Sequence, residues 1–101
     1  MSYEENATIF KALADATRLK ILELLSGGEL CACKILEQFN ITQPTLSYHM
    51  KILSDSGLVE ARRDGAWMRY TINIERLEAI KSYYDNLTQI NSRNNYVKDR
   101  S

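Results

Sequence analysis

The two cysteines of this 101-residue chain, Cys31 and Cys33, are separated by a single residue. Thiolates bind soft metal ions, and a helix N-terminus together with the nearby Lys34 favours the thiolate form. On a regular helix, residues i and i+2 point about 200° apart, so both sulfur atoms can meet one ion only in an extended or loosened turn. We predict that the two cysteines lie at the start of a helix over residues 29–39, and we therefore expect a bound soft ion to strain the first turn of that helix. The plainer alternative is one small buried hydrophobe and one incidental cysteine.

Other chemistry based on cysteine or histidine has little support. Four-coordinate zinc needs more ligands than these two cysteines and the single histidine, His49, can supply. A cysteine-dependent enzyme also needs a third orienting group or an oxyanion-stabilising feature, and none is evident. We predict that the protein is not an enzyme and that it uses no cofactor.

The compartment expected for the chain bears on the state of its thiols. The N-terminal residues do not resemble a signal peptide, and no apolar run approaches the roughly 18–20 residues that span a bilayer. We expect a cytoplasmic protein without a membrane partner, whose thiols stay reduced. The spacing of the cysteines also argues against an easy disulfide between them.

The composition predicts one small domain. With 45% apolar and 26% charged residues, the chain can form one modest core, of a size that dimerisation often reinforces. The formal net charge is zero, which counts against a sequence-blind nucleic-acid binder but not against a specific one with locally sorted charge. We place the domain at residues 1–91 and a polar, disordered tail at residues 92–101.

The stretch after the cysteines predicts a helix with both ends defined. Thr42 is a good N-cap, Pro44 fits the first turn, and Gly57 is typical of a left-handed stop. An apolar stripe starts at Leu46 and recurs at i+4 and i+7. The other face carries hydrogen-bonding groups and one positive charge, a mixture that suits a DNA major groove. Our candidates for this DNA face are Gln43, Thr45, Ser47, Tyr48, His49 and Lys51.

The neighbouring segments favour DNA binding over the alternative, a surface helix that is polar only for solubility. Helices are predicted over residues 4–14, over 18–25 with Thr17 as the cap, and over 29–39. The last of these is joined to the helix at 42–56 by a turn of about three residues, which is the spacing of a helix-turn-helix.

A β-hairpin is predicted directly after these two helices. Residues 58–63 and 67–72 are typical of strands, and Asp64-Gly65 between them is a strong hairpin signal. A hairpin in this place is a wing, and its arginines are well placed for DNA phosphates or a minor groove. These arginines are Arg62, Arg63 and Arg69. The alternative is a solvated hairpin with ordinary surface charge.

A last helix is predicted over residues 75–90, with apolar side chains along one face. In a domain this small, we expect this face to form a dimer surface with the first helix, in addition to closing the chain's own core. The candidates are Ile9, Phe10, Leu13, Leu77, Ile80, Tyr84 and Leu87. The predicted fold is mainly α with a small β-hairpin wing, a dimeric winged helix-turn-helix of order ααααββα.

Five segments resemble the ArsR/SmtB family of winged-helix metal-responsive repressors. They are residues 13–22, 29–33, 42–53, 56–59 and 63–70. The Glu-Leu-Cys-x-Cys segment is similar to the arsenical-resistance repressors within that family.

The resemblance implies a homodimer on double-stranded operator DNA that is released when arsenite or antimonite binds the thiolates of Cys31 and Cys33. Many members have a third cysteine three residues after the second, where this chain has Leu36. The third ligand would then come from solvent, from a small thiol or from nothing. Zinc-sensing members use aspartate and histidine on the last helix, where this chain has no histidine.

Two other functions remain open at this point. One is a repressor of the same fold that responds to thiol oxidation instead of a metalloid. The other is a cytosolic metalloid carrier that uses the same two cysteines, although a carrier needs neither a wing nor a polar recognition face.

Overall fold

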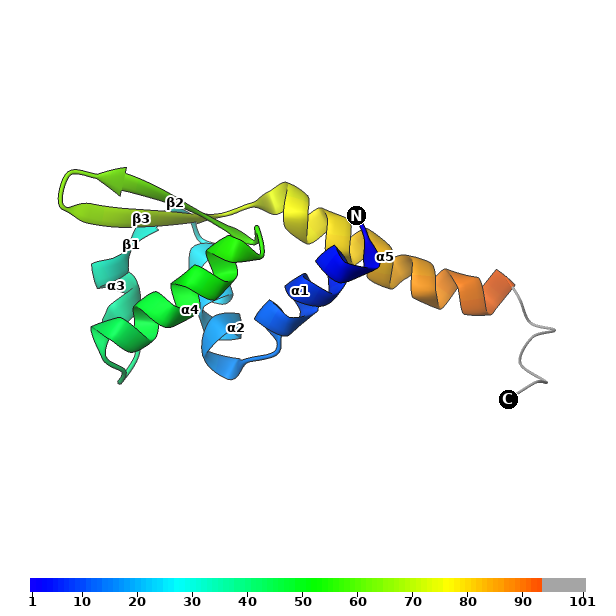
Figure 1. Ribbon diagram of the computed structural model, residues 1–101, viewed down its shortest axis with the longest axis horizontal. Coiled ribbons are helices and arrows are strands. Elements are labelled where there is room, and N and C mark those ends of the chain that lie inside the picture. Colours follow the sequence, from blue (N-terminus) through cyan, green and yellow to red (C-terminus); the bar gives the residue numbers. More distant parts are fainter. Residues whose placement is uncertain (94–101) are drawn as a thin grey trace.

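The helices and strands follow in the order α1, α2, β1, α3, α4, β2, β3, α5 (Figure 1). The computed structural model describes residues 1–93, with side chains up to residue 89. The bounds are Tyr3–Leu13 for α1, Ala16–Leu25 for α2, Leu30–Cys31 for β1, Ala32–Leu36 for α3, Gln43–Asp55 for α4, Val59–Asp64 for β2, Trp67–Ile72 for β3 and Ile74–Arg93 for α5. The predicted winged helix-turn-helix is confirmed, with β1 as an additional element.

Capping side chains define the starts of the central helices. Thr42 precedes α4 and accepts a hydrogen bond from the backbone N–H of Thr45, as expected for the predicted cap. α2 begins after Asp15, which accepts from the backbone N–H of Arg18 at 3.1 Å. The predicted cap Thr17 therefore lies inside α2, because Asp15 offers a capping carboxylate two residues earlier.

The wing contains three strands, because the chain before α3 joins the hairpin. β3 lies between β1 and β2 and is antiparallel to both. The segment 29–31 was predicted as the first turn of a helix, but Cys31 instead pairs with Arg69 of β3. The predicted hairpin is confirmed, but its turn is Gly65-Ala66 and not Asp64-Gly65, because Asp64 pairs with Trp67 as the last residue of β2. Gly65 has a positive φ of 64°.

One core joins all five helices to the wing. The predicted apolar stripe of α4 is buried at Leu46, Met50 and Leu53. The other members of this core are Ile9, Ala12, Ile21, Leu22, Leu25, Ile35, Leu58, Val59 and Ile80. Because the stripe is buried, the opposite face of α4 is directed toward solvent.

The wing and α5 lie at opposite ends of the molecule, and α5 runs beside α1 and extends beyond it (Figure 1). α5 continues through Arg93, past the predicted end at residue 90. The rest of the predicted tail, residues 94–101, lies outside the described residues. Within residues 1–93, none of the helices combines the length and the apolar character needed to cross a membrane.

Candidate functional site

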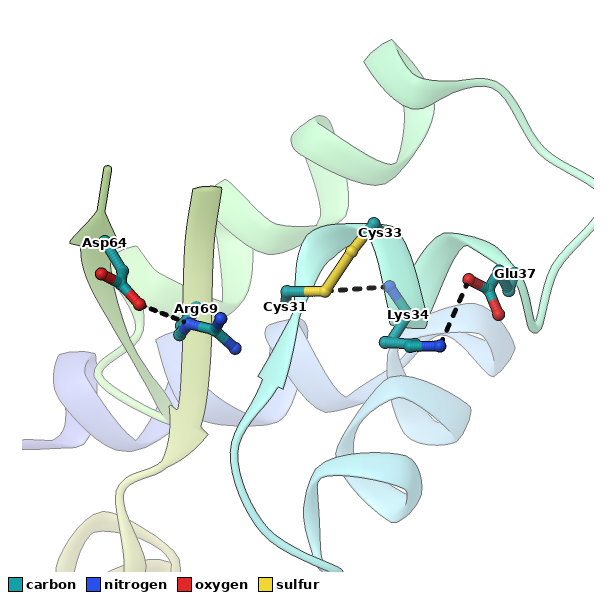
Figure 2. The surroundings of a disulfide bond; sticks show 6 residues. All are labelled: Cys31, Cys33, Lys34, Glu37, Asp64 and Arg69. Atoms are coloured by element: carbon teal, nitrogen blue, oxygen red, sulfur yellow. Dashed lines mark hydrogen bonds and ion pairs between the residues drawn. A yellow bond between two sulfur atoms is a disulfide. The ribbon is translucent and has the colours of Figure 1, made fainter. Parts of the chain in front are cut away.

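Cys31 and Cys33 lie where β1 joins α3. Cys31 is the N-cap of α3, has extended backbone (φ −78°, ψ 158°), and accepts a hydrogen bond from the backbone N–H of Lys34 to its Sγ at 3.3 Å. Figure 2 shows the two side chains turned toward each other and joined as a disulfide, with the Cα atoms 5.3 Å apart. The expectation that the thiols would not readily join is wrong, because Cys31 is not helical. The structure has instead the extended turn that the sequence analysis named as the one way to bring both sulfur atoms together.

Cys31 also belongs to the wing sheet. Its backbone pairs in register with Arg69 of β3. Arg69 Nε in turn donates to Asp64 Oδ2 at 2.9 Å across the hairpin (Figure 2). Cys31 is therefore joined both to the wing, by its pairing with β3, and to α3, as its N-cap.

A cavity of about 290 Å³ lies beside Cys33, between α3, α4 and the wing. Leu36, Trp67 and Met68 contribute to its lining. Gln43 and Ser47 of α4 line the same cavity, and both are predicted DNA contacts. The cavity therefore connects one cysteine of the pair to the predicted recognition face.

The predicted DNA face of α4 is largely exposed. The exposed members are Gln43, Thr45, Ser47, Tyr48 and Lys51. Tyr48 has 61% of its surface exposed, and Lys51 Nζ donates to Asp55 Oδ2 at 3.0 Å on the helix surface. These side chains are available to a duplex, and their contact with DNA remains a prediction.

His49, the sixth candidate, lies in the interior. It is 9% exposed, and its Nδ1 accepts a hydrogen bond from Arg18 Nη1 at 3.1 Å. Arg18 also donates to the carbonyl oxygens of Ala12 (2.7 Å) and Lys11 (3.2 Å). The assignment of His49 to the DNA face is therefore replaced by a packing role, in which it ties α4 to α1 and α2.

Two of the three wing arginines are engaged in ion pairs. Arg62 Nη2 donates to Glu29 Oε1 at 2.8 Å, and this hydrogen bond and the charge of Glu29 raise the pKa of Arg62. Arg69 is paired with Asp64 and lies opposite Arg62 in the ladder. Arg63 is exposed. If Arg62 and Arg69 contact DNA, each must give up its present ion pair with a carboxylate and pair with a phosphate instead.

The predicted dimer residues are divided between the core and the surface. Ile9 and Ile80 are buried in the chain's own core, and Leu13 and Leu77 are partly buried against it. The exposed candidates are Phe10, Tyr84 and Leu87, with 39%, 60% and 50% of their surface exposed. These three are therefore the ones left for a second chain.

Sequence reasoning missed several residues of this region. The contact between Arg18 and His49 could have been anticipated. His49 follows Leu46 by three residues and so lies on the buried stripe, where a polar side chain needs a partner. Trp67 and Met68 had no such signal, since the cavity that they line lies between α3, α4 and the wing, which are separate in the sequence. Among residues 1–93, no group of three or more His, Cys, Asp or Glu side chains could hold a metal ion.

Known proteins share both the sequence and the architecture. Residues 15–61 match the family described as "Bacterial regulatory protein, arsR family". The chain is 53% identical over 85 residues to the arsenical resistance operon repressor of Staphylococcus xylosus, covering 84% of this chain and 82% of that repressor. The crystal structure of an ArsR family transcriptional regulator is similar with a TM-score of 0.84 at 27% identity, covering 89% of this chain and 93% of that one.

A homodimeric winged helix-turn-helix DNA-binding domain from Mycobacterium bovis is also similar, with a TM-score of 0.70 at 30% identity over 94% of this chain and 84% of that one. Both solved structures share the overall fold of this chain, so the recognition helix and the wing belong to an architecture that is known from other regulators. The chain belongs to the ArsR family of bacterial regulatory proteins and is a winged-helix, DNA-binding regulator of transcription, not an enzyme.

Proposed function

We propose that this protein is a cytoplasmic, homodimeric repressor of an arsenical-resistance operon, released from its operator when trivalent arsenic or antimony binds reduced Cys31 and Cys33. The observation that carries this proposal is the position of the pair between the wing and the cavity lined by Gln43 and Ser47. The name of the Staphylococcus relative supports the inducer, and the homodimeric Mycobacterium domain supports the dimer. Residues 1–91 carry both activities.

Inducer binding begins with reduction of the disulfide. Two molecules of a small thiol open the bond and leave as their own disulfide, which yields two cysteine thiols. Arsenite, As(OH)₃, then exchanges two hydroxyl groups for the sulfur atoms of Cys31 and Cys33 and releases two water molecules. Arsenic stays trivalent and keeps one hydroxyl group, consistent with the lack of a third His, Cys, Asp or Glu side chain around the pair in the described part of the chain.

Two routes lead from the bound arsenic atom to the DNA-binding elements. An arsenic atom bonded to both sulfur atoms fixes their separation, which two free thiols do not, so the first turn of α3 and the end of β1 must adjust when it binds. The shift of β1 acts on Arg69 through the backbone ladder. The shift of Cys33 changes the cavity that Gln43 and Ser47 also line.

The DNA-binding surface combines α4 with the wing. The exposed α4 side chains face the bases and phosphates of the major groove, and Arg62, Arg63 and Arg69 face phosphates or the minor groove. A two-fold dimer formed through α1 and α5 places two recognition helices ~34 Å apart, on an imperfect palindrome.

The decisive experiment is fluorescence anisotropy of a labelled duplex from the gene's own upstream region, at one fixed salt concentration. Reduced protein is titrated first, and arsenite is then added. We expect tight binding that arsenite releases in the native protein but not in the Cys31→Ser, Cys33→Ser variant. Serine is a good N-cap, so the variant keeps the cap of α3. Binding that arsenite leaves intact in the native protein contradicts the inducer but not the repressor.

The disulfide favours one second candidate, a repressor that responds to thiol oxidation. In that case oxidation of the pair by peroxide, with water as the other product, changes DNA affinity in the absence of any metalloid. The same duplex separates the two candidates when oxidised and reduced proteins are compared without arsenite. Equal affinity of the two forms excludes the redox repressor.

A further inference from the structure

A carboxylate from outside the β-hairpin holds one of the wing arginines. Arg62 of β2 reaches past β3, which lies between β2 and β1, and its Nη2 donates to Glu29 Oε1 at 2.8 Å. Glu29 lies directly before β1. We propose that Glu29 competes with DNA phosphates for Arg62 and so limits what the wing contributes to DNA affinity. This inference rests on the DNA contact of Arg62 in the proposed function.

The ion pair draws Arg62 away from the tip of the wing. Arg62 and Arg69 are direct partners in the ladder, where like charges destabilise each other. Arg69 Nε donates to Asp64, the last residue of β2 before the turn (Figure 2). Glu29 lies nearer the base of the wing, because β1 runs toward the turn and Glu29 precedes it. The two carboxylates therefore hold the two arginines in opposite directions along the wing.

This arrangement lowers the positive charge that the wing presents to DNA. The formal net charge of the chain is zero, so attraction to a duplex depends on cations that are locally free. Within the part of the chain that the structure describes, Arg63 is the only arginine of the hairpin without an ion pair. A duplex that recruits Arg62 must therefore first displace Glu29.

The ion pair is suited to such an exchange. The side chain of Arg62 is 57% exposed and that of Glu29 is 35% exposed, so opening the pair leaves no charge buried without a partner. An exposed ion pair contributes little to the stability of a fold. A guanidinium can bind a phosphate through two parallel hydrogen bonds, which is a stronger contact. DNA can therefore take Arg62 from Glu29, but at a cost in affinity.

The test compares two glutamates that differ in their contact with Arg62. Glu29→Gln keeps the size of the side chain and removes the charge that holds Arg62. Glu60→Gln is the matched control, because Glu60 is exposed, lies two residues before Arg62 on β2 and so shares its face of the strand. Each variant removes one negative charge from the wing region, so the two change the long-range attraction to DNA in a similar way.

The measured quantity is the apparent dissociation constant of reduced full-length protein for the labelled duplex, at one fixed salt concentration and without arsenite. We expect Glu29→Gln to lower this constant about two- to fivefold more than Glu60→Gln does, which is the range that an exposed ion pair is worth. A disturbed β1 in Glu29→Gln would instead weaken binding, and that result contradicts the competition.

A second set of variants shows whether the effect acts through Arg62. Arg62→Gln should weaken binding, because it removes the phosphate contact. In the Arg62→Gln background, Glu29→Gln and Glu60→Gln should have equal effects, since no guanidinium remains to be released.

The outcomes separate this inference from the proposed function. Equal effects of Glu29→Gln and Glu60→Gln in the native background overturn the competition, and so does a gain from Glu29→Gln that persists beside Arg62→Gln. Native affinity in Arg62→Gln also overturns it, because Arg62 then makes no DNA contact. In each of these cases, native protein that binds the duplex and is released by arsenite leaves the inducible repressor standing. If native protein does not bind the duplex, both proposals fail together.

Discussion

The two sides of α4 are held very differently. Toward α1 and α2, the buried Arg18 donates to His49 Nδ1 at 3.1 Å and to the carbonyl oxygens of Ala12 and Lys11. Toward α3 and the wing, α4 borders a cavity of about 290 Å³ that also contains Cys33. The closed side fixes the position of the helix, whereas the open side leaves room for it to respond. Under the proposed function, the two sides of α4 thus have different tasks: one holds the helix in position, and the other takes part in regulation.

Breaking the closed side should have the largest effect. Arg18→Met keeps an apolar stem but removes the donors to three acceptors, of which two are in buried hydrogen bonds and the third is partly buried. Leaving such groups unpaired should lower the free energy of unfolding by about 2–4 kcal/mol. Urea unfolding at one protein concentration measures the change. Glu23→Ala, an exposed change on the same helix, is the control and should stay within about 0.5 kcal/mol. Equal midpoints for the two variants would contradict a closed side built on Arg18.

The chain is also closely packed just after the C-terminal end of α4, where Gly57 lies against Arg76 of α5. Gly57 has a φ of 82°, and an added Cβ would lie 2.5 Å from Arg76 Nε. Gly57→Ala should therefore cost about 1–2 kcal/mol, because the backbone is strained and the Arg76 side chain must move. The matched control is Gly27→Ala, where φ is not in the left-handed region and the nearest atom is 3.7 Å away. A loss as large in Gly27→Ala would show that added side-chain bulk, and not the conformation of Gly57, is responsible.

The exposed DNA face of α4, which adjoins the open side at Ser47, can be tested at Lys51, four residues further along the same exposed stripe. If Lys51 contacts a phosphate, Lys51→Ala should weaken binding to all duplexes alike, by about 1 kcal/mol, and reduce the salt dependence by about one counterion. Asp55→Asn removes the partner of Lys51 but keeps its charge, and should not weaken binding. A change in sequence preference without a change in salt dependence would assign Lys51 to bases instead.

The sequence predicted the open side less completely than the rest of the fold. The ends of α4, the hairpin and the apolar stripe follow from local signals such as Thr42, Gly65 and the spacing from Leu46. The disulfide depends on β1, a two-residue strand whose pairing with β3 is not a local property, and the cavity lies between segments that are far apart in the sequence. His49 was misassigned for a related reason, because its polarity was weighed more heavily than its position on the stripe.

The smallest effect is expected from the negative charge of Asp15, the N-cap of α2, on the closed side of α4. The hydrogen bond from the backbone N–H of Arg18 lowers the pKa of Asp15, with a further contribution from the Arg18 charge. A carboxyl whose folded pKa lies below its unfolded value, about 3.9, stabilises the fold above that value and loses this contribution as the pH falls through the folded pKa.

Asp15→Asn keeps a good N-cap without the titrating charge. The difference between the native and variant unfolding free energies should therefore be constant between about pH 5 and 7 and should shrink below about pH 4. Urea midpoints of both proteins across this range measure it, and the other carboxyl groups cancel in the difference. Parallel curves down to the lowest pH would mean that the carboxylate of Asp15 adds nothing to the closed side beyond its role as a cap.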